Sequence, residues 1–208
     1  MFVEEAIIEY VNELFDVVGV AMDNTSNDRI MIVGLVTTPE RDLDEFVHER
    51  GKSIMRGFIL HAKERQDRLL AFIRSKNFSA ELIGKLGYPL FGQLNLKHLA
   101  VSAGLGLQGK NTLVINPQYG PWLRFMTVRT DAPVALTGSG MYSKEENPYC
   151  RDCDRCLKAC PVSILEPYQL LDANRCLAAI SEDRCAELAI CDKCVVACPV
   201  GQRKSRID

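Results

Sequence analysis

All nine cysteines of this 208-residue chain lie beyond residue 149, and this uneven distribution constrains the fold more than any other feature. They are Cys150, Cys153, Cys156, Cys160, Cys176, Cys185, Cys191, Cys194 and Cys198. Hydrophobic residues make up 47% of the chain, so the cysteine-free part can bury a core without disulfides. We therefore expect two domains, a body over residues 1–145 and a cysteine-dense domain over residues 146–208.

The first cysteine run, from Cys150 to Pro161, has the spacing C-x2-C-x2-C-x3-C-P. Bacterial ferredoxins with two [4Fe–4S] clusters have this pattern, and its fourth cysteine binds the other cluster. Three thiolates on a tight loop can reach three irons of one cubane, while the fourth points toward a neighbouring cluster. The proline then fixes the direction in which the chain leaves.

A second run, from Cys191 to Pro199, repeats the last three cysteines and the proline but lacks a leading cysteine. Cys176 is the natural replacement for it. By pseudo-symmetry we predict two sets of cluster ligands. The first set is Cys150, Cys153, Cys156 and Cys198; the second set is Cys160, Cys176, Cys191 and Cys194. Cys185 is left over, and a lone thiol is most simply a small buried hydrophobe.

Two other uses of the cysteines fit less well. A disulfide framework needs an oxidising compartment and usually an even number of cysteines. Structural zinc prefers paired C-x2-C knuckles to a triple C-x2-C-x2-C that ends in C-P. The doubled C-x3-C-P therefore favours iron–sulfur clusters over both.

Charge and hydropathy exclude several kinds of partner. The net charge is −2 and the charges are spread along the chain, so no basic field marks a nucleic-acid or anionic-membrane partner. The first ten residues, MFVEEAIIEY, are acidic where a signal peptide is basic. No apolar run approaches the ~20 residues that span a bilayer. We expect a cytoplasmic protein without a membrane or nucleic-acid partner.

Hydrophobic periodicity predicts a body of mixed helices and strands, and hence an α+β or α/β layer structure. The expected helices cover residues 3–18, 43–86 with breaks near Gly51 and Asn77, and 94–103; the expected strands cover residues 29–37, 112–116 and 123–130.

A glycine-rich segment, Gly104-Leu-Gly106-Leu-Gln108-Gly109-Lys110-Asn111, lies between the last predicted helix and the next strand. It matches G-x-G-x-x-G, but a dinucleotide fingerprint follows a strand and opens a helix. A phosphate loop needs Ser or Thr directly after the lysine. Two interpretations stay open: a helix terminus with a tight turn, or a backbone that approaches a large cofactor closely.

Several segments together resemble the epoxyqueuosine reductases. They are Ala103–Asn116, Gly120-Pro121-Trp122, Thr130-Asp131, Cys160-Pro161, Pro167-Tyr168, Leu171-Asp172-Ala173, Arg175-Cys176 and Cys191–Pro199. These reductases share with the reductive dehalogenases a cobalamin-binding, nitroreductase-like body and a two-cluster tail. The resemblance implies an α+β chain in which a nitroreductase-like α/β body precedes a ferredoxin-like domain with two [4Fe–4S] clusters.

The resemblance also implies that the body holds a base-off cobalamin, with FMN as the alternative. The implied cofactor-binding residues are Gly104, Gly106, Gln108, Gly109, Lys110 and Asn111. The family's acidic proton donor has no counterpart between Gly87 and Leu96, so no catalytic residue is assigned; Lys110, Tyr88 or Tyr149 could supply a proton. We expect a short form without the family's tRNA-binding extension.

Three functions remain in competition. The first is an iron–sulfur oxidoreductase in which a ferredoxin- or flavodoxin-type donor supplies low-potential electrons and the body reduces an unidentified small molecule. The second is an electron-transfer partner that reduces another protein, for example a corrinoid protein. The third is a binding module with structural or redox-sensing clusters, although two adjacent clusters are more than a structural role needs.

Overall fold

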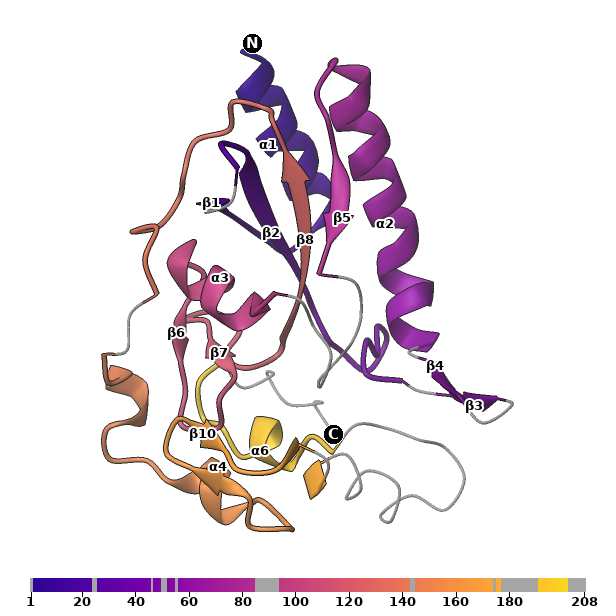
Figure 1. Ribbon diagram of the computed structural model, residues 1–208. Coiled ribbons are helices and arrows are strands. Elements are labelled where there is room, and N and C mark those ends of the chain that lie inside the picture. Colours follow the sequence, from indigo (N-terminus) through magenta and orange to yellow (C-terminus); the bar gives the residue numbers. More distant parts are fainter. Residues whose placement is uncertain are drawn as a thin grey trace. The chain divides into compact units, whose positions relative to one another are not determined.

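The computed structural model describes residues 2–23, 26–45, 47–49, 52–54, 56–84, 94–142, 145–173, 175–176 and 191–201 (Figure 1). The chain divides into two compact units, each built from several segments. Unit 1 comprises Met1–Val36, Ala62–Gly106 and Arg124–Ser143; unit 2 comprises Thr37–His61, Leu107–Leu123 and Lys144–Asp208. The predicted domain boundary after residue 145 remains a prediction, since these units are defined by packing and each is discontinuous in sequence. Along the described residues, no helix combines the length and apolar character needed to cross a membrane.

A four-stranded sheet with the order β1-β2-β8-β5 forms the centre of unit 1. Its strands are β1 (Val17–Met22), β2 (Arg29–Val36), β5 (Glu81–Ile83) and β8 (Leu123–Thr130). β1 pairs antiparallel with β2, and β5 pairs antiparallel with β8. The six central residues of β2 are buried, as its uninterrupted apolar run predicts for an internal strand.

Three helices belong wholly or partly to unit 1: α1 (Val3–Leu14), α2 (Arg56–Ser75) and α3 (Leu96–Ser102). Helix α1 buries Ile7, Val11 and Leu14, whose spacing of four and three residues places them on one face. In Figure 1 α1 and α2 run beside one another, and the ring of Tyr10 stacks on that of Phe72 with centroids 4.1 Å apart. The apolar stripe of α1 therefore belongs to the core.

We predict that Ile7→Ala lowers the free energy of unfolding by about 2–5 kcal/mol, because the truncated side chain leaves a cavity in a packed core. Ile7 is fully buried, whereas its neighbour Ile8 is only partly buried on the same helix. Ile8→Ala is therefore the matched control and should cost clearly less. Urea denaturation followed by far-ultraviolet circular dichroism measures both, and equal losses would contradict this assignment of the core face.

The predicted helix over residues 3–18 is wrong in its last turn, because α1 ends at Leu14 and the chain enters β1. Phe15 is extended, with φ −129° and ψ 152°, and the Asp16 carboxylate accepts the backbone N–H of Val36 at 2.7 Å. Both features turn the chain alongside β2. Val18 continued the helical spacing, but β-branched residues pack well on a pleated surface.

The predicted helical region over residues 43–86 is correct only for α2. Upstream, β3 (Val47–Glu49) and β4 (Lys52–Ile54) form an antiparallel hairpin, and downstream β5 joins the sheet. The break at Asn77 is confirmed by its positive φ of 64°; Gly51 lies outside the described residues. Strand pairing, within a local hairpin for β3 and β4 and with the distant β8 for β5, overrides local helical periodicity here.

The remaining predicted elements are confirmed as β2, α3, β7 (Val114–Ile115) and β8. The body is thus a mixed α and β structure, as expected, while its nitroreductase-like character stays a prediction.

Unit 2 consists mainly of short elements between loops. Besides the β3–β4 hairpin it contains a 3-10 helix η1 (Pro148–Cys150), the helices α4 (Arg155–Lys158) and α6 (Lys193–Val196), and the two-stranded pairs of β6 (Leu107–Gln108) with β7 and of β9 (Leu165–Glu166) with β10 (Gln169–Leu170). Ile115, Ile164 and Val195 are buried within this unit, as are the thiols of Cys156 and Cys198.

Candidate metal centre

The four cysteines of the first set lie around one cavity in unit 2. The side chains and backbone that line it are those of Lys110, Asn111, Ile115, Tyr149, Cys150, Cys153, Cys156, Cys198, Pro199 and Val200. Cys156 and Cys198 are buried, and the other two cysteines are half-buried. The structure thus gathers the four thiols that the spacing assigned to one cluster, from positions up to 48 residues apart (198 − 150).

The second set gathers around Cys194. Burial, and to a lesser extent charge on Cys191, Cys176, Cys156 and Cys160, raises the pKa of the Cys194 thiol to about 12. The three other members of the second set are therefore neighbours of Cys194, and Cys156 of the first set is near as well. Cys185 lies outside the described residues. The role of both sets as cluster ligands stays a prediction.

A repeated local structure carries the cysteines of both runs. Cys156 is the second residue of α4 and Cys194 is the second residue of α6. Each four-residue helix follows an aspartate at its N-cap, Asp154 or Asp192, and ends at a C-cap alanine directly before the last cysteine of the run. The repeated sequence therefore produces a repeated fold, as the pseudo-symmetric assignment requires.

The environment of the first set disfavours free thiolates. Burial raises the pKa of Cys156 to about 11, and it is also the main cause of the raised pKa values of Cys150 and Cys198. Backbone hydrogen bonds oppose the rise, from the N–H of Lys110 to Cys150 and from the N–H of Val200 to Cys198. A bound metal supplies the positive charge that stabilises thiolates in such a place, so this donor set fits an iron–sulfur cluster.

No three His, Cys, Asp or Glu side chains of the described residues are placed to bind one common metal ion. In a cubane each cysteine binds a different iron, so the ligands of a cluster stand farther apart than those of a single ion.

Lys110 and Asn111 contact both cysteine runs. Lys110 Nζ donates to Asp154 Oδ1 at 2.8 Å and to the carbonyl oxygen of Arg151 at 3.2 Å. The hydrogen bond between the two side chains lowers the pKa of Asp154 and raises that of Lys110. Asn111 Nδ2 donates to the carbonyl oxygen of Cys194 at 3.3 Å.

The predicted cofactor segment is divided between the two units, with Gly104 and Gly106 in unit 1 and Gln108 to Asn111 in unit 2. Gly104 has φ 76° directly after the C-cap of α3, and a Cβ there would lie 3.3 Å from the Cα of Gly138. The structure therefore bears out a helix terminus at this glycine.

The other residues of this segment also have contacts within their own unit. A Cβ on Gly109 would lie 2.6 Å from Ile115 Cγ1, and Gln108 Nε2 donates to the carbonyl oxygen of Tyr168 at 3.4 Å. Whether these six residues also bind a cofactor stays a prediction.

Asn147, a residue that the sequence did not single out, precedes the first cysteine run as the N-cap of η1. It is fully buried. Its Oδ1 accepts the N–H of Tyr149 at 3.0 Å, its Nδ2 donates to the carbonyl oxygen of Leu107 at 3.4 Å, and its N–H donates to Tyr168 Oη at 3.2 Å. The Asn-Pro dipeptide directly before Tyr149-Cys150 is a turn signal that could have identified it.

We predict that Asn147→Ala costs about 1–3 kcal/mol in unfolding free energy, because buried N–H and C=O groups lose their partners. Asn95 is the matched control, since its Oδ1 accepts the N–H of His98 at the start of α3 but its side chain is exposed. Asn95→Ala should cost less, near the ~1 kcal/mol of an ordinary cap. Chemical denaturation of the reconstituted proteins compares the two, and a smaller loss for Asn147→Ala would contradict its role.

The backbone that follows Cys198 passes very close to the backbone at Gly120, and this close approach holds it in place. Gly120 and Gly201 have φ 56° and 61°. A Cβ on Gly120 would lie 1.9 Å from the carbonyl oxygen of Val200, and a Cβ on Gly201 would lie 2.1 Å from the nitrogen of Gly120. Only glycine fits at these positions, and the close approach fixes the residues next to a first-set cysteine.

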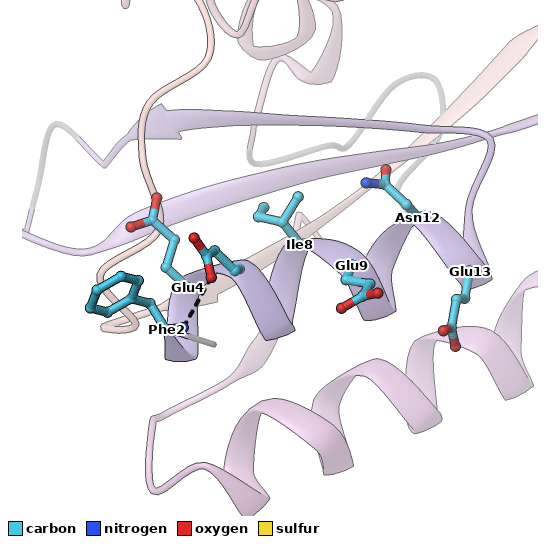
Figure 2. Close-up of a pocket in the computed structure, with 7 residues that line it drawn as sticks. Phe2, Glu4, Ile8, Glu9, Asn12 and Glu13 are labelled. Atoms are coloured by element: carbon cyan, nitrogen blue, oxygen red, sulfur yellow. Dashed lines mark hydrogen bonds between the residues drawn. The ribbon is translucent and has the colours of Figure 1, made fainter.

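An open cavity of unit 1 runs along the exposed face of α1 (Figure 2). It is lined by Phe2, Glu4, Glu5, Ile8, Glu9, Asn12 and Glu13. Glu5 accepts the N–H of Phe2 at 3.0 Å, and Glu4 accepts the N–H of Ala135 at 2.6 Å, so two of its carboxylates have structural partners. None of the predicted site residues lines this cavity.

Comparison with known proteins gives no matching family model. Among curated proteins, the epoxyqueuosine reductase of Synechocystis sp. is 37% identical over 98 residues, which is 47% of this chain and 32% of the relative. That of Gloeobacter violaceus is 35% identical over 105 residues, 50% of this chain and 31% of the relative. The chain thus matches about a third of the length of these relatives.

Solved structures extend the likeness to nearly the whole chain. A selenomethionine-labelled epoxyqueuosine reductase superposes with a TM-score of 0.69 at 20% identity, covering 97% of this chain and 66% of that one. A reductive dehalogenase whose structure suggests a mechanism for B12-dependent dehalogenation superposes with a TM-score of 0.66 at 16% identity. The match covers 97% of this chain and 32% of that one. Such identities show the fold alone. Over about half its length the chain is therefore similar in sequence to epoxyqueuosine reductases, and its fold is similar to that of an epoxyqueuosine reductase and of a reductive dehalogenase.

Proposed function

We propose that this chain is an iron–sulfur oxidoreductase that passes low-potential electrons through two [4Fe–4S] clusters to a cofactor, cobalamin, and reduces an unidentified substrate. A ferredoxin- or flavodoxin-type protein would supply the electrons. Its relatives are named as reductases, which supports the reaction class.

The observation that carries the proposal is the gathering of the first set around one cavity, with the second set next to it. Helix α4, which carries Cys156, contacts helix α6, which carries Cys194, so members of the two sets are near each other. Electron transfer between two clusters needs such proximity.

Cobalamin as the acceptor rests on the fold shared with a B12-dependent dehalogenase. When bound, a corrinoid supplies a strongly reducing metal centre. The residues Gly104, Gly106, Gln108, Gly109, Lys110 and Asn111 remain the proposed contacts on this chain. The region that could hold a proton donor, around Tyr88 and from Gly87 to Gln93, lies outside the described residues.

One observation favours a second candidate, an electron-transfer protein that reduces a partner such as a corrinoid protein. Lys110 and Asn111 make their hydrogen bonds to the cysteine-bearing segments. A segment that serves the clusters in this way does not need a cofactor in the body.

Anaerobic reconstitution followed by cofactor binding separates the two candidates. The protein is incubated with hydroxocobalamin or FMN, passed over a desalting column, and examined for a bound visible spectrum. About one corrinoid per chain supports the enzyme. Reconstituted clusters with no bound cofactor, together with reduction of an added corrinoid protein, support the electron carrier; clusters that reduce neither would refute both.

A further inference from the structure

Lys110 carries a positive charge into the lining of the first-set cavity. The residue is 9% exposed, and the other described residues of the lining are neutral side chains or thiols. Lysine is rarely buried without a partner, because desolvating its ammonium is costly. The partners of this ammonium are Asp154 Oδ1 and the carbonyl oxygen of Arg151.

Both partners belong to the loop that presents three of the four first-set cysteines, Cys150, Cys153 and Cys156. Arg151 follows Cys150, and Asp154 stands between Cys153 and Cys156. The carbonyl oxygen of Lys110 accepts the N–H of Tyr168 at 3.1 Å. The lysine is therefore held at three points beside these thiols.

From this geometry we propose that Lys110 is a positioning residue that also raises the reduction potential of the cluster held by the first set, with Asp154 lowering it. The inference rests on the proposed function, because it requires a cluster at these cysteines. Reduction adds one electron to the cluster, and a nearby positive charge stabilises the added negative charge. Hydrogen bonds to the sulfurs act in the same direction.

Three substitutions and an internal reference test this charge effect. Lys110→Met removes the charge at similar length, Lys110→Arg keeps it, and Asp154→Asn removes the opposing carboxylate. The reference is Asp192→Asn, because Asp192 has the same N-cap place in the second run but lies between Cys191 and Cys194 of the second set. It identifies which redox transition belongs to the second set.

The measurement is a redox titration of the reconstituted full chain, followed by electron paramagnetic resonance. We expect Lys110→Met to lower the ratio of reduced to oxidised cluster about tenfold at a given potential. For one electron this corresponds to a reduction potential about 59 mV lower for one of the two transitions. Asp154→Asn should shift the same transition upward. Lys110→Arg should stay near the wild type, and Asp192→Asn should move the other transition.

A purely structural role predicts that Lys110→Met and Asp154→Asn act in the same direction or not at all, and either result overturns the proposal. If Lys110→Met loses the cluster, Asp154→Asn and Lys110→Arg still show in which direction the charge of this pair shifts the reduction potential. Failure of the proposed function can be told apart from failure of this inference. In the first case the iron content of the wild-type chain would be too low for two clusters. Intact clusters with unmoved potentials would refute this inference alone.

Discussion

Cys156→Ser is expected to remove one cluster and leave the chain with about four of its about eight iron atoms. Cys156 is buried and lines the first-set cavity, where a serine hydroxyl is a poor substitute for a thiolate. Cys194→Ser should cause the equivalent loss in the second set. Iron and acid-labile sulfide, measured after anaerobic reconstitution, give the result directly.

Cys185→Ser is the matched control, because the pseudo-symmetric assignment leaves Cys185 unused. It should keep about eight iron atoms per chain. An equal loss of iron in Cys185→Ser and Cys156→Ser would overturn the assignment of the two sets. If Cys156→Ser retained all its iron, the assignment of the first set would be wrong.

Gly120→Ala is expected to destabilise unit 2 strongly. Its Cβ would overlap the carbonyl oxygen of Val200, and a backbone atom cannot rotate away as a side chain can. The positive φ costs about 1–3 kcal/mol, and the overlap adds about 3 kcal/mol more. Because Val200 lines the first-set cavity, we also expect slower cluster loading.

Gly140→Ala separates the two costs of that substitution. Gly140 has φ 73°, but a Cβ there meets nothing within 4 Å. It should therefore show the backbone cost alone, about 1–3 kcal/mol, and keep its iron. Thermal denaturation and iron content of both variants test this comparison, and equal stability losses would show that the close approach at Gly120 can relax.

Cysteine spacing predicted most of the candidate centre because the ligand pattern is local. The run from Cys150 to Cys160 and its partial repeat from Cys191 specify two loops of the same shape, and the short helices α4 and α6 reproduce this repeat. For the missing ligand two thiols remained, Cys185 and Cys176, and the resemblance at Arg175-Cys176 agrees with the choice of Cys176. Its position near Cys194 agrees with that choice.

Contacts between distant segments could not be predicted in this way. Lys110 and Asp154 are 44 residues apart, and no periodicity joins them. The sequence left open whether the glycine-rich segment is a helix terminus or a cofactor loop; the structure shows a helix terminus at Gly104 and contacts of Lys110 and Asn111 with the cysteine runs, and cofactor binding stays a prediction. In the body, strand pairing made Val17–Met22 and Glu81–Ile83 strands of one sheet, although both overlapped predicted helical patterns.

The most direct test of the account is the metal content of the wild-type chain after anaerobic reconstitution. Iron, sulfide and zinc are measured per chain, and the reduced protein is examined by electron paramagnetic resonance. The account predicts about eight iron and eight sulfide per chain, with signals from two interacting [4Fe–4S] clusters. Zinc in place of iron, or iron without sulfide, would contradict it.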